Sequence, residues 1–324
     1  MLFKSWLKSP WIRTFLLIFL ASGAVLNGIA WMQARAMTHY VEGGDRTAKP
    51  ESLSLAGKAW IVLTGVRLPR PTNERSPAAL DLPYETHVID LPPNERLETW
   101  FIPAENSRGV VLLFPPYGAS KQTLLAQSQI FHELGYSTLL VDFRGVGGSS
   151  GSDTTLGVRE GEDVAYAVRY AEQHWPGQPI VLYGASMGAV AVMRAIAHEG
   201  VAPSAVILES PFDSLLNTVR HRFDAMSLPS FPSAELIVLW GGWQQEINGF
   251  THNPVEYACA INSPVLLLHG EKDRRVSLQD AQAIFEALPD QKQLVIFSAT
   301  GHGSLASANP TQWRQHVQQL LNRQ

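Results

Sequence analysis

The chain has 324 residues, of which 45% are hydrophobic and 17% charged, and this fits one large globular domain with a short appendage. Its formal net charge of -4 argues against a nucleic-acid partner, which would call for a strongly basic surface. The single cysteine, Cys259, excludes an intramolecular disulfide but leaves the cellular compartment open.

The first distinctive feature is an uncharged, apolar run near the N-terminus, Thr14–Met32. Its length is close to the ~20 residues that a helix needs to cross a bilayer. Basic residues precede the run: Lys4, Lys8 and Arg13. The nearest basic residue after it is Arg35, and this bias favours a cytoplasmic N-terminus.

Tryptophans flank the same run, as expected of indole rings at headgroup depth: Trp6, Trp11 and Trp31. We therefore predict a cytoplasmic N-terminus and transmembrane anchor over residues 1–36, in the cytoplasmic membrane, with the remainder of the chain on the extracytoplasmic side. The alternative is a secreted protein whose signal peptide is cleaved at Ala34-Arg35-Ala36. The run is long for a signal core of about 7–15 residues, which favours the single-pass anchor.

Residues 37–83 are rich in Pro, Thr, Asn and charge, so we expect a linker with one short packed segment at Ala59–Val66. Two strands, Glu85–Asp90 and Leu97–Ile102, are then predicted around the Pro92-Pro93-Asn94 turn. This pattern is typical of an antiparallel hairpin, which would open the main domain over residues 84–324.

Beyond the hairpin, short continuous apolar runs predict strands that are buried on both faces: Val110–Phe114, Thr138–Val141, Ile180–Tyr183, Val206–Leu208, Val265–Leu268 and Leu294–Phe297. Segments with helical periodicity lie between and after them: Lys121–Leu134, Gly161–His174, Met187–His198, Leu278–Leu288 and Thr311–Leu321. The alternation predicts an α/β fold, a mostly parallel sheet with helices on both faces.

One interval, from Glu209 to Val265, is too long for an ordinary connection. It contains the apolar stretch Leu236–Trp240 and Trp243 among polar residues. We therefore expect helices that lie over the carboxyl ends of the strands and form a cap, about residues 212–256.

The candidate nucleophile is Ser186, in Gly184-Ala185-Ser186-Met187-Gly188. The motif follows a predicted buried strand and leads directly into a predicted helix, and its glycines permit the sharp turn that exposes a serine hydroxyl. Because a chance match to G-x-S-x-G is common, the strand–turn–helix setting carries the prediction.

A second match, Gly147-Gly148-Ser149-Ser150-Gly151, shows why the setting matters. It has no strand directly before it and no helix directly after it. We expect Ser149 to lie in a tight structural loop beside the site.

A serine nucleophile needs a general base, which follows the acid in chain order and lies in a loop after the last strand. His302 meets this description, between Gly301 and Gly303. Its closest rival, His269, ends a predicted buried strand, where a structural hydrogen-bonding role is the commoner one.

Two aspartates compete for the acid that orients the histidine. Asp273 lies in the loop after the strand Val265–Leu268, and Asp213 follows the preceding strand. A carboxylate at the first position would hold the imidazole in its productive tautomer. We predict Asp273 as the acid and keep Asp213 as the alternative.

An oxyanion hole requires two backbone N–H groups, one from the residue after the nucleophile and one from the loop after the first parallel strand. Met187 provides the first. In the second loop Pro115 and Pro116 have no N–H, so Tyr117 is the earliest donor.

These segments together resemble α/β-hydrolases, over a stretch from about Tyr84 to the C-terminus. The resemblance is carried by three segments, Val111–Gly118, Asp142-Phe143-Arg144-Gly145 and His269–Asp273, and it is closest to the lipase, esterase and serine-aminopeptidase-like branch. The chain resembles a membrane-anchored member of bacterial type. Pro115-Pro116 stands where the family commonly has His-Gly, a departure that affects the shape of the oxyanion loop.

The resemblance implies a serine hydrolase that cleaves an ester-type bond, in a carboxylic ester, acyl lipid or thioester, through an acyl-enzyme and without a cofactor. The expected partners are a small-molecule or lipid acyl substrate and the membrane. A peptidase, an acyltransferase and a catalytically silent anchored binding module remain alternatives, because a fold does not fix a function. No pair of histidines has metal-ligand spacing near an acid, so no metal is expected.

Overall fold

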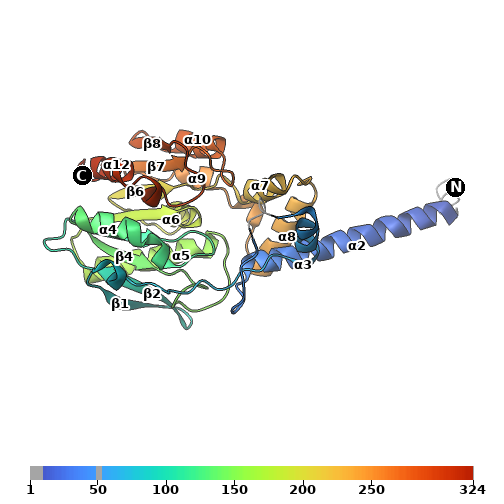
Figure 1. Ribbon diagram of the computed structural model, residues 1–324, viewed down its shortest axis with the longest axis horizontal. Coiled ribbons are helices and arrows are strands. Elements are labelled where there is room, and N and C mark those ends of the chain that lie inside the picture. The colour runs from blue at the N-terminus through green and yellow to red at the C-terminus, as the bar shows by residue number, and fades with distance from the viewer. Residues whose placement is uncertain (1–9, 49–52, 324) are drawn as a thin grey trace.

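The computed structural model of the chain describes residues 10–48 and 53–323. A long N-terminal helix projects from an α/β body, and further helices lie between the two (Figure 1). Lys4, Trp6 and Lys8, on which the predicted membrane orientation partly rests, lie outside the described residues.

The body is built on an eight-stranded sheet in the order β1-β2-β4-β3-β5-β6-β7-β8. Its strands are β1 Glu85–Leu91, β2 Glu95–Ile102, β3 Val110–Phe114, β4 Ser137–Val141, β5 Ile180–Ala185, β6 Ala205–Glu209, β7 Val265–Gly270 and β8 Lys292–Phe297. Strand β2 pairs antiparallel with β1 and β4, and every other pair is parallel. The prediction of an antiparallel hairpin leading into a mostly parallel sheet is confirmed.

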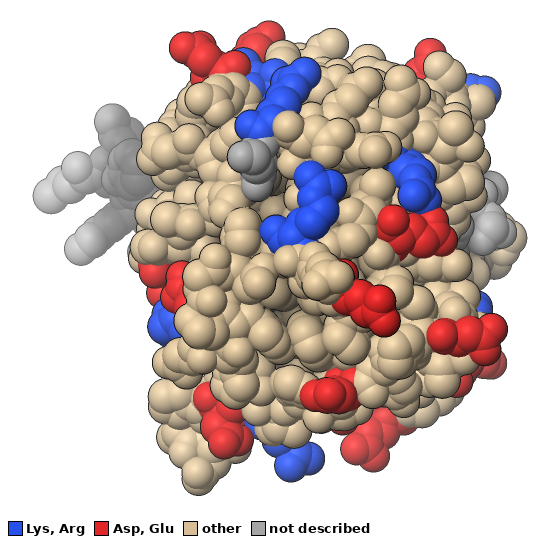
Figure 2. Space-filling model, turned by 90° about the vertical axis from the view of Figure 1, so that its left-hand side faces the viewer, with Lys and Arg blue, Asp and Glu red and all other residues tan. Residues whose placement is uncertain are grey.

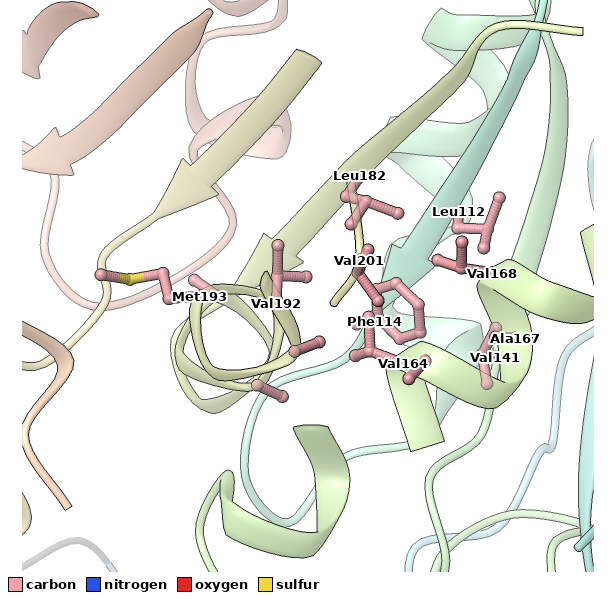
Figure 3. Packing of buried hydrophobic residues seen from close by; sticks show 14 of the residues in the cluster. Leu112, Phe114, Val141, Val164, Ala167, Val168, Leu182, Val192, Met193 and Val201 are labelled. Carbon is pink, nitrogen blue, oxygen red and sulfur yellow. The ribbon is translucent and has the colours of Figure 1, made fainter. Parts of the chain in front are cut away.

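Both faces of the sheet are buried because successive side chains of a strand point to opposite sides. In β3, Leu112 and Phe114 contribute to one hydrophobic core, while Val111 and Leu113 contribute to another. Figure 3 shows the first core, where strand residues lie against side chains from α5 and α6. This two-sided burial explains the continuous apolar runs in the sequence.

Helices cover both faces of the sheet, as predicted. The helices that pack in the first core include α5 Val158–His174, α6 Met187–His198 and α10 Leu278–Ala287. Those in the second include α4 Leu125–Glu133, α11 Leu305–Ala308 and α12 Pro310–Leu321. The predicted helix from Lys121 is different in detail, since its first four residues form a 3-10 turn before α4 begins.

The interval between β6 and β7 holds three α-helices: α7 Leu215–Met226, α8 Ser233–Gln245 and α9 Pro254–Ala258. Helices α7 and α8 lie on the side of the body from which the N-terminal helix projects (Figure 1). The segment expected to be a linker contains α3, Leu55–Thr64, which lies beside them. The division into anchor, linker and capped domain stays a prediction.

The N-terminal helix is α2, Pro10–Thr38, and it has a mean hydropathy of 2.0 in its most apolar stretch. Among the described residues it is the one helix that is long and apolar enough to cross a membrane. Its first two thirds expose large apolar side chains, including Phe15 and Val25. Its last turns are packed against the protein through Ala30, Gln33, Ala34, Met37 and Thr38.

Figure 2 shows the end of the molecule opposite the projecting helix. Acidic and basic side chains are interspersed there among other residues. This face does not concentrate positive charge as a polyanion-binding surface would.

Candidate active site

Ser186 lies at a sharp turn between β5 and α6, with φ 50° and ψ −112°. A non-glycine residue at positive φ is strained, and such strain is typical of a nucleophile held at a strand-to-helix turn. The two glycines allow the close approaches that the turn needs. A Cβ on Gly184 would lie 2.4 Å from the Gly188 oxygen, and one on Gly188 would lie 2.3 Å from the Phe114 oxygen.

His302 lies in the loop after β8, and its imidazole bridges the other two predicted residues. The Ser186 hydroxyl lies 3.1 Å from Nε2. The opposite ring nitrogen, Nδ1, lies 2.6 Å from an Asp273 carboxylate oxygen. The structure thus brings together the three residues singled out in the sequence, although they come from three separate loops.

Asp273 is buried and its second oxygen, Oδ1, accepts backbone hydrogen bonds from Arg275 at 2.8 Å and Val276 at 3.0 Å. Burial alone would raise the pKa of this carboxyl, but its contact with His302 and the two N–H donors outweigh burial. The pKa of Asp273 therefore lies below its usual value. The group is an anion at neutral pH and can stabilise a positive charge on the imidazole.

The two alternative candidates, Asp213 and His269, have other hydrogen-bond partners or other surroundings. Asp213 accepts from the Ser214 N–H and from the Asn217 amide, both at 2.6 Å, where α7 begins. His269 is fully buried in β7, and this burial lowers its pKa. Neither makes the bridge between Ser186 and an acid that His302 makes.

Ser149 has both sides of its hydroxyl engaged within the loop after β4. It donates to the Asp142 carbonyl at 2.7 Å and accepts from the Glu98 N–H at 2.9 Å. The Asp142 side chain in turn accepts from the Lys121 N–H at 2.7 Å, just after the oxyanion loop. These bonds fit the structural role expected for the second glycine–serine motif.

The two predicted oxyanion donors, Met187 and Tyr117, line one cavity together with Ser186. Met187 is the first residue of α6, where backbone N–H groups have no acceptor within the helix. The Tyr117 hydroxyl donates to the Met37 carbonyl at 2.6 Å, at the end of α2. Arg46 donates to the Gly118 carbonyl at 3.0 Å. The oxyanion loop is thus held by segments that lie far before it in the sequence.

Glu209 supports the site, although it was not among the residues predicted from the sequence. It ends β6, and its buried carboxylate accepts from Tyr183, Trp313 and the Leu305 N–H, at 2.7, 3.1 and 2.9 Å. Burial raises its pKa, and these donors oppose the rise only in part. It fixes the chain three residues after His302. The sequence feature that could have indicated this role is a lone acid directly after the apolar run Val206–Leu208.

The cavity has a volume of about 650 Å³, within the range of small-molecule sites. It runs from Ser186 and His302 to side chains of α7, α3 and α2 that are mainly aliphatic. Within the described ranges, no group of three or more His, Cys, Asp or Glu residues could hold a metal ion. The arrangement offers a hydroxyl nucleophile, a base, an anion and an apolar binding space.

Comparison with known proteins bears on the family and the fold of the chain. The family model described as serine aminopeptidase, S33, matches residues 105–228. The Pyrococcus furiosus esterase Pf2001 superposes with a TM-score of 0.65, at 22% identity, over 79% of this chain and 98% of that one. This structural likeness bears on the fold alone.

The relatives found by sequence include a lipase and an uncharacterised protein. A lysophosphatidylserine lipase, ABHD12 of Danio rerio, is 27% identical over 169 residues, which cover 51% of this chain but only 43% of the lipase. An uncharacterised Mycobacterium tuberculosis protein, Rv2307c, is 28% identical over 225 residues, 66% of this chain and 71% of that protein. The structural likeness shows that the chain has the α/β-hydrolase fold, and residues 105–228 within that fold match the S33 family model.

Proposed function

We propose that the protein is a membrane-anchored serine hydrolase that cleaves an ester-type bond through an acyl-enzyme. Ser186 is the nucleophile, His302 the general base and Asp273 the acid that orients the imidazole. The observation that carries the proposal is the continuous chain of contacts from Ser186 Oγ to Nε2, at 3.1 Å, and from Nδ1 to Asp273, at 2.6 Å.

In the first half-reaction, His302 Nε2 accepts the proton of Ser186 as Oγ attacks the carbonyl carbon. The negative charge that forms on the carbonyl oxygen is stabilised by the backbone N–H groups of Met187 and Tyr117. Asp273 stabilises the imidazolium and keeps its Nδ1–H directed away from the serine. The intermediate collapses as the ester C–O bond breaks, and Nε2 returns the proton to the leaving alkoxide.

The second half-reaction repeats these steps with water. His302 removes a proton from the water as its oxygen attacks the acyl carbon, and the same two N–H groups receive the oxyanion. The bond to Ser186 Oγ then breaks, and Nε2 returns the proton to the serine. A carboxylic acid leaves, and the enzyme is restored.

An acyl lipid or another long-chain ester is the substrate class that the site supports best. The cavity beside Ser186 is mainly apolar, as acyl-binding pockets are, and one relative is named a lysophosphatidylserine lipase. The cap, α7 and α8, would cover this cavity as a lid.

The experiment that tests the proposed reaction is steady-state and pre-steady-state hydrolysis of chromogenic esters of increasing chain length. We expect a burst of alcohol release equal to the enzyme concentration, followed by a slower phase, wherever deacylation limits turnover. The long-chain esters should have the higher kcat/KM. Absence of hydrolysis across the whole series would leave the silent binding module as the better account.

A peptidase is the second candidate, favoured by the name of the matching family model, serine aminopeptidase. The same three residues would cleave an amide through the same acyl-enzyme, and an acyltransferase would pass the acyl group to an alcohol in place of water. Matched ester and amide substrates, with and without an added alcohol acceptor, separate the three activities by their products.

We also propose that α2 anchors the protein in the cytoplasmic membrane with the catalytic domain on the extracytoplasmic side. The supporting features are the apolar helix Pro10–Thr38 and the basic residues before Thr14. A reporter that works only outside the cytoplasm, fused after Gln324, should be active. If a reporter that works only in the cytoplasm is active at the same position, the orientation is the opposite one. A soluble product that begins near Met37 would indicate signal cleavage and secretion.

A further inference from the structure

We propose that the anchor helix α2 forms one wall of the acyl-chain site, so that the substrate's chain reaches Ser186 from the bilayer between α2 and α3. This inference rests on the proposed hydrolase activity and adds to it where the acyl chain lies. It makes the anchor part of the substrate site as well as a tether.

The first support is the lining of the cavity that contains Ser186. Leu26, Ile29 and Ala30 of α2 line it on one side. Ile61 and Val62 of α3 line it as well. One continuous space therefore joins the nucleophile to the flank of the membrane helix. Its α2 and α3 walls are mainly aliphatic, and a hydrocarbon chain is the ligand that gains most from removal from water there.

The second support is that the end of α2 is fixed to the body by specific hydrogen bonds. The Gln33 amide donates to the carbonyls of Ile61 and Val62 at the end of α3, at 2.6 and 2.8 Å. On the other side, Trp240 of α8 donates to the Asn27 side chain at 3.1 Å. Since both neighbours of α2 are bonded to it, the wall is a defined part of the site.

Small residues let α2 and α8 approach closely. A Cβ added to Gly241 of α8 would lie 3.7 Å from the Ala34 side chain, which is ordinary contact. Ala30 and Ala34 are almost fully buried and share one hydrophobic cluster with Ala234, Ile237 and Val238 of α8. This is the kind of helix contact that small residues make within membranes, and Ala30 lines the cavity as well.

The third support is the depth of the lining residues along the anchor. At about 1.5 Å per residue the uncharged run Thr14–Met32 extends roughly 28 Å, close to the ~30 Å hydrocarbon core of a bilayer. Leu26, Ile29 and Ala30 fall within that run. The cavity therefore reaches the outer part of the membrane core.

The surface around this region also fits a membrane. Large apolar side chains are exposed on α3, on α8 and in the loop before α8: Trp60, Leu63, Phe231, Leu239 and Trp243. They lie on the elements that surround the docked end of α2. Aromatic side chains of this kind favour the membrane–water interface. Because α2 is docked against α3 and α8, a bilayer that surrounds the anchor would also contact this surface.

The test measures chain-length selectivity in the full-length protein, reconstituted in phosphatidylcholine vesicles. Ile29→Trp fills the cavity from the anchor side, and Val62→Trp fills it from α3. For each variant we expect the ratio of kcat/KM for a hexadecanoyl ester to that for a butyryl ester to fall about tenfold. This is the loss expected when roughly two methylene groups lose their apolar contact.

The matched control is Val25→Trp, which adds an indole one turn before Ile29 on an exposed part of the same helix and outside the cavity lining. Its ratio should equal that of the natural chain. Val62→Trp decides the result if Ile29→Trp lowers the melting temperature, because it leaves the anchor sequence intact.

A selective fall in the cavity variants alone supports the inference. An unchanged ratio in a folded cavity variant, or an equal fall in Val25→Trp, overturns it. Failure of the proposed function would look different, because butyryl hydrolysis would then persist in Ser186→Ala.

Discussion

Ser186→Ala should lower the turnover of an ester substrate by about 10⁶-fold, the order of loss seen when a serine hydrolase loses its nucleophile. The variant removes the only atom that can form the acyl-enzyme while it leaves His302, Asp273 and the oxyanion donors in place. Steady-state hydrolysis of a butyryl ester by the purified full-length protein provides the measurement.

The matched control for this variant is Ser149→Ala, in the second glycine–serine motif. Its hydroxyl bonds to the backbone of Asp142 and Glu98, so the substitution should cost stability and leave the acyl-enzyme chemistry available. A collapse of turnover in folded Ser149→Ala, with Ser186→Ala still active, would show that the nucleophile lies in the second motif and that the assignment to Ser186 is wrong.

Asp273→Asn should lower turnover by about 10⁴-fold, by analogy with serine proteases in which the acid became its amide. The amide keeps the volume of the side chain but removes its negative charge. The amide can also donate a hydrogen bond to Nδ1 of His302. The imidazole proton would then lie on Nε2, and a protonated Nε2 cannot accept the proton of Ser186. The readout is kcat on a butyryl ester, with a thermal melt to show that the variant is folded.

Asp213→Asn is the control that separates charge at the catalytic position from charge nearby. Its carboxylate is bonded at the start of α7 to Ser214 and Asn217, so the change should cost far less activity. Equal, modest losses in the two single variants, with collapse only in the double variant, would mean that the two acids substitute for each other.

The parallel sheet could be predicted because its residues obey a local rule. A strand buried on both faces must be apolar throughout, and Val110–Phe114 and Val265–Leu268 meet that condition. The serine turn was also visible, because Gly184 and Gly188 stand where any side chain would collide with the backbone. A position that has no room for a side chain must be glycine, and a glycine can be recognised in the sequence.

The wall of the cavity could not be predicted in the same way. Ile29 lines the cavity, and α2 is held in that position at Gln33 and Asn27 by groups that lie tens to hundreds of residues away in the sequence. The hydrophobic run alone indicates a membrane helix and says nothing of which flank meets the protein. Glu209 was missed for a related reason, since its three donors converge only in the folded chain.

The central claim is that Ser186 forms a covalent bond with the substrate's acyl group, and labelling by a fluorophosphonate tests it most directly. The full-length protein would be treated with the probe, digested, and the modified residue located by mass spectrometry. The account predicts one adduct, on Ser186, absent from Ser186→Ala and strongly slowed in His302→Ala, which lacks the base. An adduct on Ser149, or labelling of Ser186→Ala at the natural rate, would contradict it.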